Sequence, residues 1–353
     1  MLRGRPIDRA THVGAGNIPC EIEEQRSSGD TWRIGLTLMV LGGLALQRGD
    51  LARADALHTE AARTMRETGN PNEIGSVLQL GQVACELGQP ERARHLVAEA
   101  EALARARQDH AALGAALHLR ALLAVGDGAL ATAAELLEQA LALRGPDQPG
   151  VARSLTTLGH VRLDLGQDRP ALDAFAEAVG RARASGERCE LIRAIEGCAR
   201  WLASSHAEAA LRLAGATDAQ RLSLGSVPWP SERHYLEGWL ARARRELEPL
   251  AYERAWDDGH AATLAQAVSL VEALTLAPSI AAALGGALSR REQEVAILLA
   301  RGLTNKQIAA SLIVSPATVR SHVEHILGKL GLRSRAQIAV WASQQGLLPG
   351  QLE

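Results

Sequence analysis

A pattern with a period of about forty residues recurs between residues 35 and 215, and it restricts the possible folds more than any other feature. Each unit is an apolar run with helical spacing that ends in a glycine and a polar residue. Small residues stand at fixed distances from three of these turns, with a glycine seven residues before each turn and alanines five and twelve residues after it. The turns are Gly49-Asp50, Gly88-Gln89, Gly126-Asp127 and Gly166-Gln167, and the small residues are Gly42, Ala54, Ala61, Gly81, Ala93, Ala100, Gly159, Ala171 and Ala178.

The third unit fits the pattern when Gly128 replaces Gly126 as its reference. The alanines then fall at Ala133 and Ala140, at the cost of two extra turn residues and of the upstream glycine. A fifth, weaker unit surrounds Ser205, with Ala210 in register. A fixed period of this length is typical of proteins built from stacked structural repeats.

The positions of the small residues have a physical reason. Small side chains let two antiparallel helices approach closely, and each helical hairpin buries its apolar face only by stacking on its neighbours. The pattern therefore predicts an α-solenoid, whose concave face is a surface for a peptide, a partner protein or a small effector. It resembles the tetratricopeptide repeat, which has the same glycine and two alanines but is shorter. A non-repetitive helical bundle rich in alanine is the alternative.

Composition agrees with an all-α fold. Aromatic residues make up only 3% of the chain, whereas alanine and leucine, both strong helix formers, supply the apolar content. The longest apolar run, Ile34 to Leu46, is shorter than the roughly 20 residues that a membrane span needs. We interpret this run as a buried helix and expect no membrane association. The four widely spaced cysteines and the lack of a secretory signal predict a cytoplasmic protein.

Residues 229–273 form a further helical region that contains an unusual number of aromatic side chains. An aromatic pocket is one interpretation. A cap that closes the open end of the solenoid is the favoured one, because a terminal repeat must cover its exposed apolar side. The histidines of the repeats fall at different phases, so we interpret them as core or solvated residues rather than a ligand cluster. The aromatic residues are Trp229, Tyr235, Trp239, Tyr252 and Trp256, and the histidines are His58, His95, His118 and His160.

The last 66 residues contain four helix start signals. Three are capping boxes that begin at Ser289, Thr304 and Ser334, each with Glu or Gln three residues later. The fourth is Ser315-Pro316, a capping serine before a proline at the first helical position. With glycines as stop signals, the pattern predicts helices at about 290–300, 305–312, 316–330 and 335–345.

The second and third of these helices are separated by only three residues, which is the spacing of a helix-turn-helix. On the third helix, apolar residues at three- to four-residue spacing predict an inner face of Val319, Val323, Ile326 and Leu330. The opposite face carries Ala317, Arg320, Ser321, Glu324 and Gly328. Its small residues would let the helix approach base edges, Arg320 could pair with guanine or phosphate, and Glu324 could accept from cytosine.

Charge supports this interpretation. Residues 288–353 hold eight basic and four acidic residues, a net charge of +4, whereas the rest of the chain has a net charge of -6. A basic module on an acidic body is what binding to a phosphate backbone requires.

Several segments of this region are similar to the LuxR-type helix-turn-helix over its whole length. The resemblance implies a dimeric transcriptional regulator, with Arg320, Ser321 and Glu324 facing bases, Thr304, Asn305 and Lys306 facing phosphate, and the final helix at the dimer contact. Glu324 departs from the basic residue that is frequent at this position in the family. The matching segments are Leu288–Val295, Gly302–Ala309, Val314–Val323, Lys329–Gly331 and Arg335.

The repeats resemble more loosely the helical sensor arm of the large ATP-binding, MalT-like LuxR regulators. Those proteins place a nucleotide-binding domain before the repeats, but this sequence has no GxxxxGK[ST] motif, so we expect no ATPase activity. We interpret the chain as a natural short form or as the C-terminal part of such a regulator. The expected organisation is a poorly ordered lead-in at 1–30, repeats at 31–275, a linker at 276–287 and the DNA-binding domain at 288–353.

The predicted function is sequence-specific DNA binding in transcription regulation, with the arm sensing an effector or a partner protein. A helical-repeat scaffold whose C-terminal module does not bind DNA is the alternative. We expect no enzyme activity, no cofactor and no metal; His322 and His325 are assigned to the DNA-facing helix. The expected partners are double-stranded DNA and a second copy of the chain, with RNA polymerase as a further candidate. The predicted DNA-contacting residues are Thr304, Asn305, Lys306, Pro316, Ala317, Thr318, Arg320, Ser321, Glu324 and Lys329.

Overall fold

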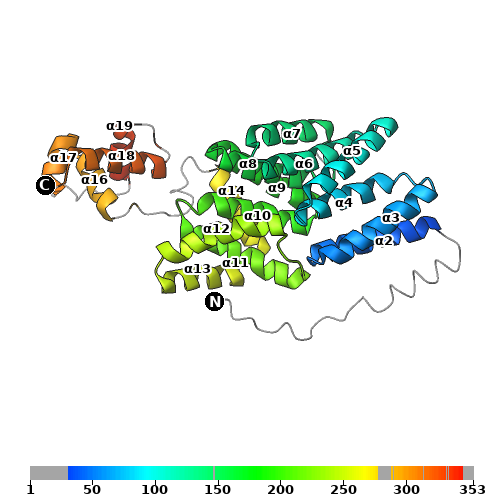
Figure 1. Ribbon diagram of the computed structural model, residues 1–353. Coiled ribbons are helices and arrows are strands. Elements are labelled where there is room, and N and C mark those ends of the chain that lie inside the picture. Colours follow the sequence, from blue (N-terminus) through cyan, green and yellow to red (C-terminus); the bar gives the residue numbers. More distant parts are fainter. Residues whose placement is uncertain are drawn as a thin grey trace.

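The computed structural model describes residues 31–145, 148–276, 288, 290–312, 314–330, 332 and 334–344. Within these ranges the regular structure consists of seventeen α-helices and no strand, which confirms the all-α prediction (Figure 1). Residues 1–30 and 277–287, the predicted lead-in and most of the predicted linker, lie outside the described ranges. Among the described helices, none combines the length and the apolar character that a membrane crossing demands.

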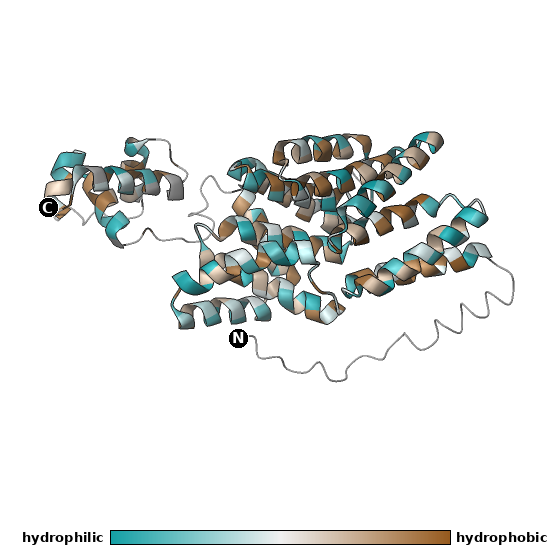
Figure 2. Cartoon of the chain, viewed as in Figure 1, coloured by the Kyte–Doolittle hydropathy of each residue, from teal (hydrophilic) through white to brown (hydrophobic). Residues whose placement is uncertain are grey.

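Five antiparallel hairpins follow one another along the chain, and this is the predicted solenoid. The first helix of one hairpin contacts the first helix of the next in several cases, as between α8 and α10, so the first helices line a common inner face. The helices carry hydrophobic and hydrophilic residues on different sides (Figure 2). The pairs are α2 (Thr31–Gln47) with α3 (Leu51–Glu67), α4 (Glu73–Glu86) with α5 (Pro90–Arg107), α6 (His110–Gly126) with α7 (Leu130–Leu143), α8 (Val151–Asp164) with α9 (Asp168–Ser185), and α10 (Arg188–Leu202) with α11 (Ala207–Leu224).

The alanines of the repeat pattern lie in the core. Each of those predicted in the first four units, and Ala210 of the fifth, has no exposed surface. The third unit follows the predicted register, because the left-handed φ of 76° falls on Gly128 rather than on Gly126. A residue with a side chain rarely adopts that backbone conformation, so the turn selects glycine at this place.

The glycine that precedes a turn makes room for a large side chain from the second helix of its hairpin. A Cβ added to Gly159 would lie within 3.0 Å of the Phe175 ring, and one added to Gly197 of α10 would meet the same ring. Phe175 has no exposed surface. Gly42 faces His58 in the same way in the first hairpin. These glycines therefore set the distance between helices.

Three helices follow the fifth hairpin, α12 (Pro230–Glu246), α13 (Pro249–Ala261) and α14 (Leu264–Leu276). Helix α13 packs on α11, and α14 contacts α9, α10 and α11, so these two cover the end of the solenoid as predicted. The cap prediction is wrong for α12. Its aromatic residues Trp229, Tyr235 and Trp239 instead line a cavity together with residues of α4, α6, α8 and α10.

The C-terminal region has four helices, α16 (Arg290–Ala300), α17 (Asn305–Leu312), α18 (Pro316–Leu330) and α19 (Arg335–Gln344). The first three agree with the predicted bounds, and residue 345 lies outside the described ranges. Capping boxes form at both described starts: Thr304 N–H donates to Gln307 Oε1 at 2.8 Å, and Ser334 N–H donates to Gln337 Oε1 at 3.1 Å. Ser289 is not described.

Candidate functional site

The helix pair α17 and α18 is held by a small core that it shares with α16 and α19. Ile308, Val319 and Ile326 have no exposed surface, and Val323 packs against the same cluster. The predicted inner face of α18 is confirmed at these positions, whereas the side chain of Leu330 is not described. The Ser315 hydroxyl accepts a hydrogen bond from Thr318 N–H at 3.0 Å, which fixes the start of α18 directly after the turn. The geometry is that of a helix-turn-helix.

The opposite face of this pair is open. Lys306, Arg320, Ser321 and Glu324 are exposed, as their helical phase predicts. Within the described part of the chain, no acidic residue forms an ion pair with Lys306 or Arg320. Their charges are therefore available to a ligand, and small or short side chains lie beside them. Such a face suits contact with a polyanion.

Four of the other predicted DNA-contacting residues have described side chains, and two do not. Thr304, Pro316 and Thr318 are exposed, and Asn305 is half-buried at the start of α17. The hydroxyls of Thr304 and Thr318 take part in capping hydrogen bonds with Gln307 and Ser315. The side chains of Ala317 and Lys329 lie outside the described residues.

Two arginines that contribute to the basic charge have internal partners. Arg291 donates to the carbonyl of Leu312 at 2.6 Å and pairs with Glu294. Arg335 donates to the carbonyl of Leu303 at 2.7 Å, which ties α19 to the loop before α17. Charge counting does not reveal these roles, because the partner carbonyls, at the end of α17 and in the loop before it, are brought near only by the tertiary fold. Among the described basic side chains of residues 290–344, Arg301, Lys306, Arg320 and Arg335 are exposed, and Arg335 donates to the internal carbonyl of Leu303.

The last helix buries Ile338 and Ala342 in the domain core and exposes one large apolar side chain to solvent. Trp341 is half-buried and packs against the cluster that holds α16 to α19. Val340, its neighbour, is 57% exposed. If α19 contacts a second copy, Val340 is therefore the better candidate for the contact.

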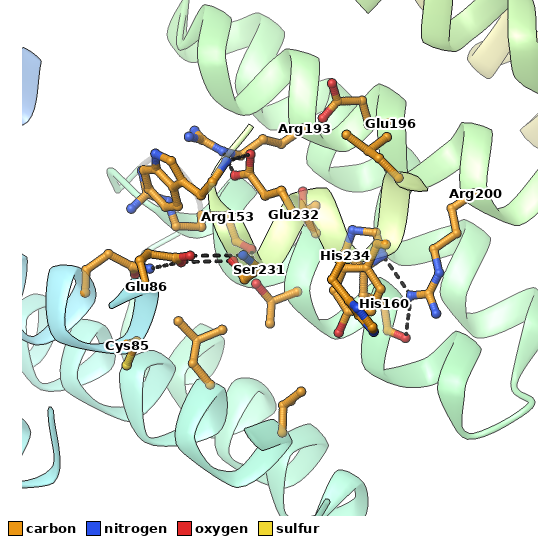
Figure 3. A pocket seen from close by; sticks show the side chains of 18 of the residues that line it. Cys85, Glu86, Arg153, His160, Arg193, Glu196, Arg200, Ser231, Glu232 and His234 are labelled. Atoms are coloured by element: carbon orange, nitrogen blue, oxygen red, sulfur yellow. Dashed lines mark hydrogen bonds and ion pairs between the residues drawn. The ribbon is translucent and has the colours of Figure 1, made fainter. Parts of the chain in front are cut away.

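A second candidate site lies on the inner face of the helical arm. A cavity of about 350 Å³ is enclosed by the inner helices and α12 (Figure 3). One wall is apolar, with Leu122 and Val125, and the other carries Arg153, Arg193 and Arg200. This volume lies within the usual range for small-molecule sites, roughly 300–1,000 Å³. The aromatic pocket, the less favoured interpretation of residues 229–273, agrees with Trp229, Tyr235 and Trp239 in the lining, but the charged wall was not predicted, because the residues of the site come from five helices.

The charges of this site are organised around buried carboxylates. Glu190 accepts from Arg153 Nε at 3.0 Å and from Arg193 Nη1 at 3.0 Å. Burial would raise the pKa of Glu190, but these two guanidinium groups lower it to about 2. Arg221 donates to both oxygens of Glu196 at 2.7 Å, a bidentate pair that is almost completely buried. Burial raises the pKa of Glu196 in spite of this pair. The cluster cross-links α8, α10 and α11.

Two of the repeat histidines line the cavity, His118 as a buried and His160 as a half-buried side chain. Burial, with help from Arg153 and Arg144, lowers the pKa of His118 to about 3. Burial and Arg200 lower the pKa of His160 to about 3. His160 stacks on Tyr235, with ring centroids 4.6 Å apart. His118 and His160 occupy similar positions on α6 and α8, whereas His58 and His95 lie on second helices of their hairpins.

Comparison with known proteins assigns the C-terminal region. Residues 286–342 match the family described as bacterial regulatory proteins, luxR family. Residues 44–125 and 150–203, within the repeats, match the family described as anaphase-promoting complex subunit 5. The first match spans α16 to α18 and most of α19.

Curated relatives with matching segments are named as regulators. A putative HTH-type transcriptional regulator of Mycobacterium tuberculosis is 32% identical over 142 residues, which are 40% of this chain and 16% of that protein. The nitrate/nitrite response regulator NarL of Escherichia coli is 45% identical over 58 residues, 16% of this chain and 27% of NarL. The oxygen regulatory protein NreC of Staphylococcus aureus is 46% identical over 61 residues, 17% of this chain and 28% of NreC. The matches thus span less than a third of each relative.

Two solved structures resemble the arm at low overall similarity. The MamA protein has a TM-score of 0.30 and 17% identity, covering 62% of this chain and 98% of its own. A Podospora kinesin light chain with TPR-like repeats has a TM-score of 0.35 and 18% identity, covering 64% and 97%. The fold assignment of the arm depends instead on its own hairpins and buried small residues. The chain thus joins a tetratricopeptide-like helical arm to a C-terminal helix-turn-helix domain of the luxR family of bacterial regulatory proteins.

Proposed function

We propose that the protein is a DNA-binding transcription regulator whose α18 enters the major groove. The exposed, unpaired Arg320 on the outer face of α18 carries this proposal. Family membership of the domain and the names of its relatives support it. In this arrangement Arg320, Ser321 and Glu324 read base edges, while Thr304, Asn305 and Lys306 hold the phosphate backbone. Pro316, Ala317, Thr318 and Lys329 complete the proposed contact surface.

The arm acts in this proposal as the sensing part. An effector or a partner segment binds at the inner face, and binding changes the fraction of molecules whose C-terminal domain is competent for a two-fold DNA site. The cavity of about 350 Å³, with its mixture of apolar and charged walls, supports this role. A homodimer on DNA and contact with RNA polymerase belong to the same proposal.

Arg320→Ala and Lys306→Ala test the roles of the DNA-facing residues in the full-length protein. A duplex selected from a random pool by the wild-type protein serves as the specific target. If Arg320 pairs with a base, its loss weakens specific binding by about 1–3 kcal/mol and leaves binding to random DNA nearly unchanged. Loss of a phosphate contact at Lys306 lowers affinity for every sequence and reduces the salt dependence. Fluorescence anisotropy against salt measures both.

Arg63→Ala is the matched control, because Arg63 is an exposed arginine of the arm in an i,i+4 pair with Glu67. It should leave both affinities unchanged. Equal losses on specific and random DNA for both test variants would contradict the assignment of Arg320 to base contact. Failure of the wild-type protein to enrich any duplex, with the arm folded, would favour the scaffold alternative.

A further inference from the structure

A short segment after the fifth hairpin returns to the first two hairpins. The N–H of Val227 donates to the carbonyl of Gln47 at 3.1 Å, and the indole Nε1 of Trp229 donates to the carbonyl of Leu46 at 3.0 Å. Leu46 and Gln47 end α2, and the Leu46 carbonyl also accepts from the N–H of Gly49 at 3.1 Å. The segment thus adds one backbone and one side-chain hydrogen bond at the end of α2.

The indole of Trp229 occupies a slot formed by side chains of two inner helices. The guanidinium carbon of Arg193 lies 4.1 Å from the ring centroid, and that of Arg153 lies 5.0 Å from it. Both arginines are fixed by Glu190. Cations over a ring face attract the aromatic quadrupole, so the slot selects an aromatic side chain.

A carboxylate three residues later is held by a second set of donors. Glu232 accepts from Arg193 Nε and, at 3.1 Å, from Arg221 Nη2. It also accepts from the backbone N–H of Trp229 at 3.0 Å, which caps the start of α12. Beside it, the N–H and hydroxyl of Ser231 donate to Glu86 of α4 at 3.1 and 2.9 Å. The inner face therefore holds an aromatic side chain, that of Trp229, together with an acidic side chain three residues later, that of Glu232.

The segment is held as a bound peptide is held, by one buried anchor. Trp229 is 4% exposed, whereas Val227 and Pro230 on either side are exposed. Helix α12 buries only Trp239 and Ala243 of its seventeen residues. Arg153, Arg193 and Trp229 line both the cavity of about 350 Å³ and a second cavity of about 260 Å³ that extends to α2. The indole therefore has unfilled space close to it.

We propose that residues 226–232, the clasp segment, are a displaceable internal ligand of the inner face. The external ligand is a peptide segment of a partner protein with the same chemistry: a tryptophan, a carboxylate three residues later, and a free backbone N–H two residues before the tryptophan. This inference rests on the proposed sensing role of the arm. The partner peptide takes over the slot between Arg153 and Arg193 and releases α12 from α2 and α4.

A fluorescein-labelled synthetic peptide with the sequence of residues 225–238 tests the proposal. It is titrated into the full-length wild-type protein and into the double variant Trp229→Ala/Glu232→Ala, which removes both side-chain anchors from the internal competitor. We expect the peptide to bind the double variant at least tenfold more tightly than the wild type, as measured by anisotropy. The matched control is the same peptide with Trp229→Ala, which should bind neither protein.

Circular dichroism establishes that the double variant is folded before titration. If it is not folded, Ser231→Ala replaces it, since this change removes the hydroxyl contact with Glu86 and should give a smaller gain in peptide affinity. Equal binding of the test and control peptides to a folded variant would overturn the proposal. So would equal affinity of wild type and variant, because the peptide would then bind elsewhere. DNA binding is measured on the same samples. Loss of DNA binding by the wild-type protein would contradict the proposed function, whereas the peptide titration alone tests the clasp segment.

Discussion

The exposure of individual residues on the outer face of α18 could be predicted from the sequence, because helical phase fixes the face on which a side chain lies. Arg320 and Glu324 are exposed opposite Val319 and Ile326, as the apolar spacing predicts. The internal contacts of Arg291 and Arg335 could not be predicted from the sequence, since each depends on a carbonyl that only the tertiary fold brings near. Local periodicity carries no information about such partners.

The buried histidines make stability depend on pH at the residue scale. Burial lowers the pKa of His58 to about 4, and burial with Arg153 lowers the pKa of His118 to about 3. Both rings are neutral in the folded protein but take up protons below about pH 6.5 when unfolded. Stability from these groups is therefore complete above pH 6.5 and is lost as the pH falls towards 4.

Thermal unfolding at pH 7.5 and 5.5 checks this expectation. Each buried histidine should cost on the order of 1 kcal/mol at the lower pH, so the melting temperature falls. His118→Gln should make the melting temperature less dependent on pH, whatever it does to stability itself. His95→Gln, at an exposed position of α5, is the control and should keep the wild-type pH dependence. An unchanged slope for His118→Gln would contradict the burial argument.

At the scale of the elements, caps and turn glycines allowed the helix bounds to be predicted with little error. Thr304, Ser315 and Ser334 begin helices as their side-chain chemistry requires. The register of the repeats followed from the alanines, which are buried in every unit. Gly197 was not identified, because the need for glycine comes from a ring on a different helix, that of Phe175.

Gly197→Ala tests whether close helix approach stabilises the arm. The added methyl group would meet the Phe175 ring on one side of α10, so the buried ring or a helix must move. We expect a loss of about 1–3 kcal/mol in the free energy of unfolding. Gly180→Ala is the matched control, because nothing lies near its added Cβ on α9. Alanine there should stabilise the helix by about 0.5–1 kcal/mol, as chemical denaturation can measure. Stabilisation by both changes would argue against the packing role.

At the scale of the whole molecule, the order of arm and DNA-binding domain could be predicted, because each has local signals. The path of α12 could not. Its contacts join residues that are 183 positions apart, as between Leu46 and Trp229, and no periodicity marks a pairing over that distance. The expectation of a cap came from the general need to cover the end of a solenoid, a need that α13 and α14 already meet.

The proposed assembly of two copies on DNA can be tested at α19. Val340→Glu places a charge at an exposed apolar position, so we expect the domain to stay folded while dimer formation and affinity for a two-fold site both decrease. Leu222→Glu, at a 69% exposed position of α11, is the matched control and should change neither. Sedimentation in the presence of the selected duplex measures the oligomeric state. A Val340→Glu protein that still binds as a dimer with wild-type affinity would place the contact elsewhere.

The hydrogen bond from Trp229 to Leu46 also bears on how the arm comes apart. In an open solenoid each repeat interacts only with its neighbours, so the terminal repeats fray first and unfolding spreads inward. Here the fifth hairpin leads into a segment that is anchored on the first, and the chain of repeats is closed into a loop. We expect loss of either end to remove support from the other, so that the arm unfolds in a single cooperative transition rather than from its ends inward.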